Sequence, residues 1–349
     1  MFPCEYQTQE EGWLLVVYYH LAHTLERDTV IENIVYLVKE NPPPACSKNA
    51  SSSSRRGRKP VHSWEKLVCI CILMVIFGLT YRDMQNTVPS LNLPWNNDEP
   101  YPDHTWIART FKKIPLKYLE DILTRSAYMC LKETGSKKEE GLLLLASDST
   151  GIETDRYDYE VRPVKRKKKF ELIRVKQYLK WHIIAVLDHL VILSVRTTNK
   201  NTHDSPVLRT MLNRLKKKCG VIVDLLAGST FNADSGYDGE NNYKSIFMMN
   251  MFPNIRQRIN ARNKGRNRKY RKKASEIFNL SQYHYRGLIE GIFGAEETAH
   301  HQLYCKFRLK NNQKRFGLIM GIGWNLGVLN RLQCAKRLEI KMTPYVILN

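Results

Sequence analysis

The sequence lacks the features that mark secreted, zinc-binding and membrane-spanning proteins. Its eight cysteines are scattered and no two have the Cys-x-x-Cys spacing, so neither a zinc site nor a disulfide framework is expected. No apolar run reaches the roughly 20 residues of a membrane helix; the longest lie at residues 67–79 and 317–329. The first eleven residues are polar and carry no basic segment, unlike a secretory signal. We therefore expect a cytoplasmic protein that does not bind a membrane.

Acidic residues are the second shortage. Lys and Arg number 55 against 34 Asp and Glu, which gives the 349-residue chain a net charge of +21. An imbalance of that size favours a polyanionic partner, and nucleic acid is the commonest one. A hydrophobic content of 43% and 18 tyrosines exclude a disordered chain, and the length allows two or three domains.

The N-terminal part of the chain predicts helices. Apolar residues recur at helical spacing through residues 12–40, and a Pro- and Ser-rich basic linker follows. Ser63 and Asp103 are the expected N-caps of two helices, and residues 116–132 predict another. We assign residues 1–60 to N-terminal amphipathic helices with the linker. Residues 61–140 are assigned to a helical DNA-binding or assembly domain.

From residue 141 the pattern changes to short apolar runs that alternate with helices. Strands are predicted at residues 142–146, 181–187, 191–198, 221–226 and 253–259, and helices at 204–218, 242–249 and 314–332. This order matches a ribonuclease-H-like α/β fold, in which a mixed sheet is flanked by helices. We assign residues 141–334 to this catalytic domain, with a basic insertion at about 254–280, and residues 335–349 to a C-terminal tail.

Three acids stand where that fold gathers carboxylates. Asp148 follows the first strand, Asp234 follows the fourth, and Glu290 lies on a late helix. Hard oxygen ligands suit Mg²⁺ or Mn²⁺, and two ions about 3.5–4 Å apart can promote phosphoryl transfer. Each acid also has an ordinary explanation, since the two aspartates could cap turns and Glu290 could be a surface residue. Their joint occurrence in so basic a chain favours catalysis.

One continuous helix is expected to present the third acid. At about 100° per residue, Tyr283, Arg286, Glu290 and Glu297 share a stripe about 60° wide. The opposite, packing face is expected to hold Leu288, Ile289, Ile292, Phe293, Ala295 and Ala299. An ordinary amphipathic surface helix with an Arg286–Glu290 ion pair would show the same pattern.

Two boxes resemble those of insertion-sequence DDE transposases. Residues 232–238, Asn-Ala-Asp-Ser-Gly-Tyr-Asp, are similar to their Ala-Asp-x-Gly-Tyr-Asp box. Tyr283, Arg286 and Glu290 match the first three positions of their Tyr-Arg-Glu-Lys signature. Residues 148–150 and the helical region from residue 57 are also similar, so the resemblance spans about residues 57–332.

The resemblance implies a metal-dependent nuclease and strand transferase that cleaves transposon ends and joins them to target double-stranded DNA. It implies Mg²⁺ or Mn²⁺ held by Asp148, Asp234 and Glu290, with two ions expected. Tyr283 and Arg286 would contact DNA near the cleavage point. We also expect a homodimer in the DNA complex and association with the nucleoid.

The signature departs at its last position, where Glu297 replaces Lys. The intact set of three acids favours an active transposase, whereas Glu297 favours a degenerate or repurposed copy that binds DNA without cutting it. A ribonuclease-H-like nuclease with another biological role also stays open from the sequence.

The expected contacts with DNA phosphates lie in two basic runs, of which the first is residues 165–168. The second, from Arg256 to Lys273, holds ten Lys or Arg and no acid, so we expect it to be extended until it meets an anion. Asp238 is expected to matter less than Asp234. Besides Tyr283 and Arg286, the expected contacts are Lys165, Arg166, Lys167, Lys168, Arg256, Arg258, Arg262, Lys264, Arg266, Arg268 and Lys269.

Overall fold

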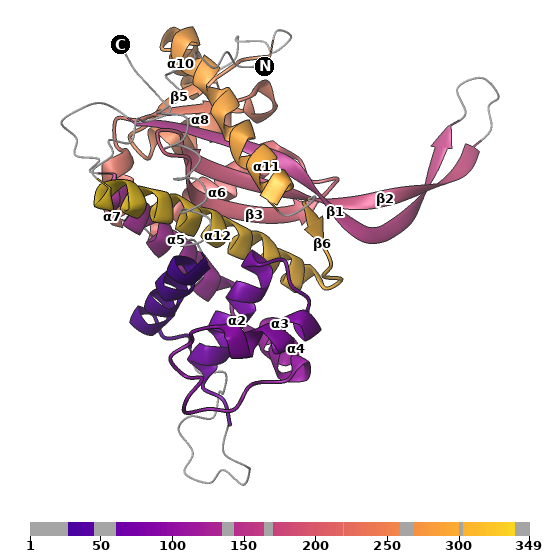
Figure 1. Ribbon diagram of the computed structural model, residues 1–349. Helices are drawn as coiled ribbons and strands as arrows, with labels where there is room; N and C mark the ends of the chain where they lie inside the picture. The colour runs from indigo at the N-terminus through magenta and orange to yellow at the C-terminus, as the bar shows by residue number, and fades with distance from the viewer. Residues whose placement is uncertain are drawn as a thin grey trace, which may run out of the picture.

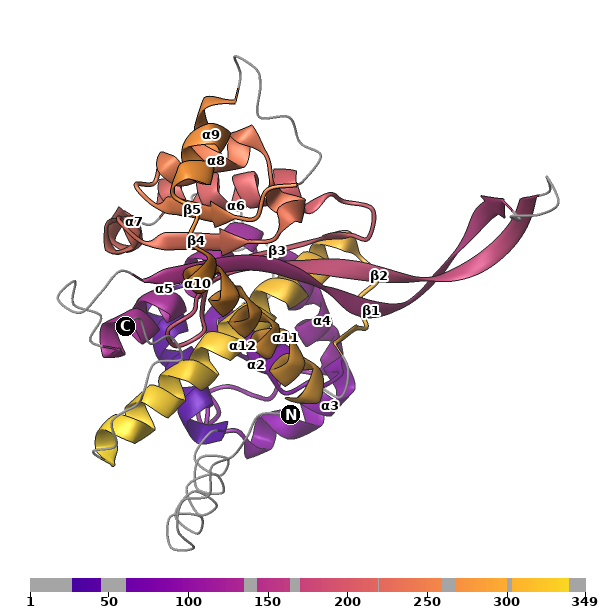
Figure 2. The same ribbon diagram turned by 90° about the horizontal axis from the view of Figure 1, so that it is seen from above.

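A computed structural model describes residues 27–44, 61–134, 143–163, 170–218, 220–258, 268–299 and 303–338. Within these ranges a six-stranded sheet is covered by helices on both faces. The N-terminal helices pack beneath it, next to the long C-terminal helix (Figures 1 and 2).

Capping side chains start the N-terminal helices where the sequence predicts. Ser63 accepts the N–H of Lys66 at the start of α2, and Asp103 caps α4. Thr80 and Asp83 form a capping box at α3. The helices of this region are residues 27–40, α2 (Trp64–Ile76), α3 (Tyr81–Thr87), η1 (Val88–Ser90), α4 (His104–Lys113) and α5 (Leu116–Glu133).

The sheet has the strand order β3-β2-β1-β4-β5, with β6 paired to β1, which confirms the predicted ribonuclease-H-like fold. β1, β2 and β3 pair antiparallel, whereas β4 and β5 join β1 in parallel. The strands are β1 (Leu144–Pro163), β2 (Phe170–Val186), β3 (Val191–Asn199), β4 (Thr230–Ala233), β5 (Phe252–Ile255) and β6 (Tyr304–Cys305). The helices between and after them include α6 (Asp204–Lys218), α7 (Gly220–Leu226), α8 (Glu240–Phe247) and α12 (Lys310–Arg337).

The predicted strand at residues 221–226 is wrong, because these residues form α7. The fourth strand, β4, follows at Thr230–Ala233. A short apolar run fits a buried strand and a buried helical turn equally well, so periodicity could not separate them. Gly228, with a φ of 84°, adopts the left-handed conformation after the helix and leads the chain into β4.

β1 and β2 are much longer than predicted and extend beyond the rest of the sheet as a two-stranded arm (Figures 1 and 2). Their pairing runs from Leu145–Val186 out to Pro163–Phe170, with one irregularity between Glu153 and Tyr157. β6 pairs with β1 at the base of the arm. The charged residues of this stretch lack the apolar alternation that marks a half-buried strand, so the sequence did not reveal the arm.

Helices cover both faces of the sheet. α6 and α8 lie on one side, and α5, α11 (Leu288–Ala299) and α12 lie on the other (Figure 2). α12 approaches β3 closely, since a Cβ at Gly317 would lie 2.0 Å from Oγ1 of Thr197. Asn325 of α12 also bonds both the N–H and the C=O of Ile192 on β3.

One hydrophobic core joins the sheet to the N-terminal helices. α2 contributes an almost continuous buried run, and α12 packs against both α2 and β3. Within the described ranges, no single helix is long and apolar enough to cross a membrane; only α2 together with the Tyr81–Ser90 segment has the length and composition, and this pair is bent by 114°.

Candidate active site

Asp148 and Asp234 occupy equivalent positions on neighbouring strands. β1 and β4 pair in parallel with Ser147 opposite Ala233; Asp148 is the next residue of β1, and Asp234 directly follows β4. The side chain of Asp148 is 20% exposed. Burial raises its pKa above the usual value; the Ser149 N–H and Arg286 oppose this shift, whereas the nearby carboxylates of Asp234 and Glu290 add to it.

A single turn of 3₁₀ helix, η2 (Ser235–Tyr237), orients the carboxylate of Asp234. Its Oδ1 accepts the N–H of Gly236 at 2.8 Å, so Asp234 caps the turn. A Cβ at Gly236 would lie 2.9 Å from the same Oδ1, too close for both atoms to keep their positions. Glycine therefore allows Asp234 to keep this carboxylate orientation.

Arg286 connects the third acid to the first. Its Nη1 is 2.9 Å from Oδ2 of Asp148, and its Nη2 is 3.3 Å from Oε1 of Glu290. The ion pair with Asp148 is the better shielded from water, because the Glu290 side chain is 63% exposed. One guanidinium thus bridges two of the three acids.

The segment that carries Glu290 is not the single helix that the sequence predicted. It consists of α10 (Leu280–His284), a 3₁₀ turn η3 (Tyr285–Gly287) and α11. A 3₁₀ turn advances about 120° per residue instead of about 100°, so it breaks the expected helical stripe. Arg286 lies in this turn and reaches Asp148.

The buried face of α11 also differs in one position from the prediction. Ile289, Ile292 and Phe293 are buried as expected, but the next buried residue is Glu296, and Ala295 is exposed. Glu297 is exposed and forms no ion pair with any residue in the described part of the chain. By helical phase it lies on the same side of α11 as Glu290, about two turns further along.

Two buried asparagines and the exposed Asn279 form a chain that aligns these elements, and the sequence did not reveal it. Asn232 of β4 donates to Leu145 O on β1 and accepts from Asn254 of β5. Asn254 also exchanges two hydrogen bonds with the backbone of Asn279, whose side chain caps α10. The network links both acid-bearing strands to the segment that leads into Glu290.

The transposase DDE domain family has a model that matches residues 139–324, more than half of the chain. This chain belongs to the transposase DDE domain family. The matched region contains the sheet, Asp148, Asp234 and Glu290. The protein is accordingly a transposase of the DDE family, whose members are metal-dependent enzymes that cut and join DNA. No curated protein matches the chain.

Solved transposase structures resemble the chain at low sequence identity. The piggyBac transposase synaptic complex with hairpin DNA is 9% identical with a TM-score of 0.39, over 82% of this chain and 71% of that one. The Mos1 strand transfer complex is 9% identical with a TM-score of 0.27, over 83% and 82%. The Drosophila P element transposase strand transfer complex is 13% identical with a TM-score of 0.27, over 55% and 37%.

DDE transposases use divalent metal ions, and the carboxylates of this transposase are the ligands that Mg²⁺ and Mn²⁺ prefer. A cation already bridges Asp148 and Glu290, namely the guanidinium of Arg286. In the ranges that the structure describes, however, no three His, Cys, Asp or Glu side chains are gathered closely enough to hold an ion. The donor types fit a metal ion, but binding one would require Arg286 to release a carboxylate and the three acids to move closer together.

The structure separates the expected DNA contacts into groups. Tyr283 is half-buried against Phe278 and lies on α10, close in sequence to Arg286. Arg256 and Lys269 are exposed, Arg268 is half-buried, and Arg258 bonds the Asp234 turn. Outside the described residues lie Lys165, Arg166, Lys167 and Lys168, between the two strands of the arm, and Arg262, Lys264 and Arg266.

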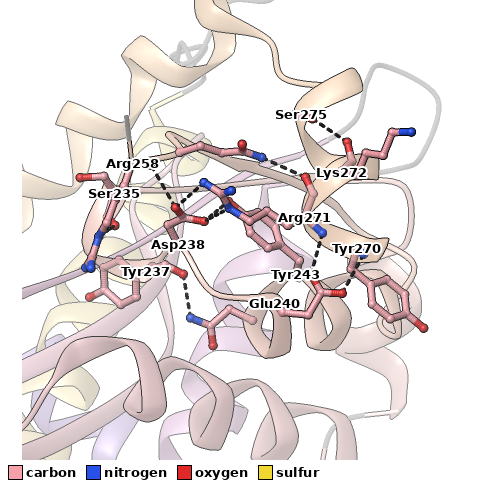
Figure 3. Close-up of polar contacts among 12 residues, drawn as sticks. Ser235, Tyr237, Asp238, Glu240, Tyr243, Arg258, Tyr270, Arg271, Lys272 and Ser275 are labelled. Atoms are coloured by element: carbon pink, nitrogen blue, oxygen red, sulfur yellow. Dashed lines mark hydrogen bonds and ion pairs between the residues drawn. The ribbon is translucent and has the colours of Figure 1, made fainter. Parts of the chain in front are cut away.

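The basic segment from residue 256 to 273 was expected to stay extended until it met an anion. Its last part instead forms α9 (Lys269–Glu276), because Arg271 has an anionic partner inside the protein. The guanidinium of Arg271 bonds both carboxylate oxygens of Asp238, at 2.8 and 2.9 Å (Figure 3). Glu240 completes the start of α9 by accepting the N–H groups of Tyr270 and Arg271.

Asp238 is a buried partner within the fold of the transposase. Its side chain is 2% exposed, and it also accepts from the Tyr243 hydroxyl and the Arg258 N–H. Burial alone would raise the pKa of Asp238, but the hydrogen bonds from Arg271, Arg258 and Tyr243 outweigh it, so the pKa is lowered. Asp238 is thus committed to donors of the protein itself.

A fourth acid, Asp204 at the start of α6, lies on the face of β1 opposite to Asp148, and sequence analysis missed it. Its Oδ1 is 3.1 Å from Nζ of Lys180 and 3.4 Å from Oγ of Ser149. Nδ1 of His182 is 3.6 Å from the same oxygen, but burial lowers the pKa of this histidine to about 4, so it is neutral near pH 7. Lys180 therefore supplies the counter-charge for Asp204.

Proposed function

We propose that Asp148, Asp234 and Glu290 are the catalytic residues of this transposase and that together they hold two Mg²⁺ or Mn²⁺ ions. The observation that carries the proposal is that one strand pairing and one arginine link the three acids. The β1–β4 register places Asp148 next to Asp234, and Arg286 bridges Asp148 to Glu290. The substrate would be the ends of a transposon, which are cleaved and then joined to target DNA.

Each residue contributes in a way that follows from its surroundings. Asp148 sits on a central strand, where its low exposure strengthens electrostatic interactions with bound groups. The Gly236 N–H fixes the orientation of Asp234, and the packed face of α11 fixes Glu290. Bound divalent ions would activate the attacking oxygen and stabilise the leaving one.

DNA would reach this site through the basic residues. Lys165, Arg166, Lys167 and Lys168 stand in the sequence between the two strands of the arm, and Arg256 and Lys269 are exposed after β5 and at the start of α9. Cations of this kind supply affinity by releasing counterions from phosphates. We further propose that Tyr283 and Arg286 contact the DNA near the scissile phosphate, as part of the Tyr-Arg-Glu-Lys type of signature. A homodimer would supply one active site for each transposon end.

The second candidate function is DNA binding without cleavage. Glu297, in place of the lysine of the signature, favours it. The substrate is a plasmid that carries the gene with its natural flanking DNA. Wild type, Asp148→Asn, Asp234→Asn and Glu290→Gln are compared for cleavage in Mn²⁺ and for binding by gel shift. Glu276→Gln, an exposed acid at the end of α9, is the control.

We expect the three active-site variants to bind DNA with wild-type affinity and to lose cleavage, while the control keeps both. If wild type binds but does not cut, the protein is a binding copy. Substantial cutting by one of the three variants would remove that residue from the catalytic set.

A further inference from the structure

The side chain of Arg258, expected from the sequence to contact DNA, turns back onto the Asp234 turn. Its Nε donates to Ser235 O at 2.9 Å, and its Nη2 donates to Gly236 O at 3.3 Å. Both acceptors belong to the backbone that immediately follows Asp234. The guanidinium therefore grips the segment that orients the second acid.

One peptide group connects the guanidinium of Arg258 to the carboxylate of Asp234. The peptide between Ser235 and Gly236 accepts from Arg258 through its C=O and donates to Asp234 Oδ1 through its N–H, at 2.8 Å. Because the peptide is planar, fixing the direction of its C=O also fixes the direction of its N–H. A charged donor on the C=O polarises the group and strengthens the N–H bond to the carboxylate.

Arg258 is itself held from the same turn. Its backbone N–H donates to Asp238 Oδ2 at 2.9 Å, and Asp238 is locked by the buried ion pair with Arg271. The side chains of Asp238 and Arg271 are 2% and 4% exposed, so this anchor is shielded from water. The turn that begins at Asp234 ends at Asp238, and Asp238 in turn fixes the backbone of Arg258.

We propose that Arg258 is a positioning residue that orients Asp234 for metal binding. The inference rests on the proposed role of Asp234 as a metal ligand. Partners that orient the ligands of a metal typically account for about ten- to hundredfold in metal affinity. From its place in a basic run, Arg258 is expected to contact DNA. The sequence does not reveal its bonding partners, because they lie 22 and 23 positions away.

The chain offers a matched control. Arg256 is exposed, lies two residues before Arg258, and forms no hydrogen bond or ion pair with any residue that the structure describes. The same substitution at the two positions removes the same charge. On charge alone, loss of a cation near the site would strengthen the binding of a divalent cation, because like charges repel. A positioning role predicts the opposite sign.

The experiment measures Mn²⁺ binding to the full chain by calorimetry, without DNA, for wild type, Arg258→Gln, Arg258→Lys, Arg256→Gln and Asp234→Asn. Thermal melts in EDTA check folding. We expect Arg258→Gln to weaken Mn²⁺ binding by about tenfold or more and Arg256→Gln to leave it unchanged or slightly tighter. Arg258→Lys should fall between, because an ammonium can donate to a carbonyl but cannot form the two-point grip.

The outcomes distinguish the ligand role of Asp234 from the positioning role of Arg258. Wild-type Mn²⁺ binding by Asp234→Asn would overturn both the ligand role of Asp234 and the positioning role of Arg258. If Asp234→Asn weakens binding but Arg258→Gln behaves like Arg256→Gln, the positioning role alone is wrong. Should Arg258→Gln fail to fold, Arg258→Lys decides, and wild-type Mn²⁺ affinity in that variant would overturn the proposal.

Discussion

Arg286 holds Asp148 by an ion pair of 2.9 Å between residues that are 138 positions apart in the sequence. The same guanidinium reaches Glu290, so without metal it acts as the counter-ion of two acids. A metal ion would compete with it for both carboxylates. DNA phosphate would attract the released arginine, which gives metal binding and DNA binding a physical reason to favour each other.

The first prediction concerns this competition. Arg286→Gln should bind Mn²⁺ more tightly than wild type in the absence of DNA, because the competing cation is gone. The free energy of unfolding of the same variant in EDTA should be lower by about 1 kcal/mol, the size expected for partly exposed pairs, because two carboxylates lose their counter-ion. Calorimetry and thermal melts measure the two effects. Equal Mn²⁺ affinity in variant and wild type would contradict the competition.

The second prediction concerns Gly236. Its φ is not in the left-handed region, so alanine is compatible with the backbone, and the added Cβ meets only Asp234 at close range. Gly236→Ala should therefore displace the Asp234 carboxylate and lower the cleavage rate by about ten- to hundredfold, with little change in melting temperature. Gly291→Ala is the control, since a Cβ there meets nothing within 4 Å. Wild-type cleavage by Gly236→Ala would show that the carboxylate tolerates the shift.

Much of this site was predictable because it rests on local chemistry. The Asp234-Ser-Gly turn is a bond between a side chain and a backbone two residues later, and the caps at Ser63 and Asp103 are equally local. The order of strands and helices placed Asp148 at the first strand, Asp234 after the fourth and Glu290 on a late helix, although the bounds of the first and fourth strands and the continuity of the helix were wrong. The one misplaced strand, at residues 221–226, lies in the stretch where an apolar run was too short to show a period.

The rest depends on contacts between distant segments, and residue types alone do not specify these. The Asn232–Asn254–Asn279 chain joins two strands and a helix cap, and each asparagine by itself resembles a turn residue. In the basic segment 256–273, Arg271 is buried in an ion pair with Asp238, although the sequence suggests that the whole segment is exposed. Arg258 and Arg286 are expected from the sequence to contact DNA, and the sequence does not reveal that both also bond partners within the protein.

The third prediction concerns the pH dependence of stability. Asp188 lies in the turn between β2 and β3, and burial raises its pKa to about 6. The unfolded chain releases this proton near pH 4, so between about pH 4 and pH 6 the folded state binds more protons and its stability falls as the pH rises. Asp188→Asn should thus stabilise the protein at pH 7 by about 1–2 kcal/mol.

The stabilisation by Asp188→Asn should disappear at pH 4, where the carboxyl group of the folded wild type is protonated. Melting curves of the variant and wild type at pH 4 and pH 7 test this difference. A gain of the same size at both pH values would mean that the substitution acts through packing or hydrogen bonding and that the pKa of Asp188 is not raised.

The fourth prediction concerns Glu297, which stands where a Tyr-Arg-Glu-Lys type of signature would have Lys. Seven residues after Glu290, it returns to the same side of α11, within about 20°, and it is exposed. It also lies in the last turn before Ala299, where a carboxylate opposes the helix dipole by about 0.3–1 kcal/mol. Glu297→Lys should therefore raise the melting temperature slightly, tighten binding to a cut DNA end, and preserve or raise cleavage.

Glu276→Lys on α9 is the control, because it makes the same change in net charge on another exposed helix. If the lysine introduced by Glu297→Lys contacts a phosphate, the slope of log affinity against log salt should steepen by about one unit more than in the control. Equal slopes would mean that position 297 does not face DNA. A variant that melts normally yet binds and cuts worse than both wild type and control would show that Glu297 has a function of its own. It would then not be a lesion in the signature, and the binding-only interpretation would lose the observation that favours it.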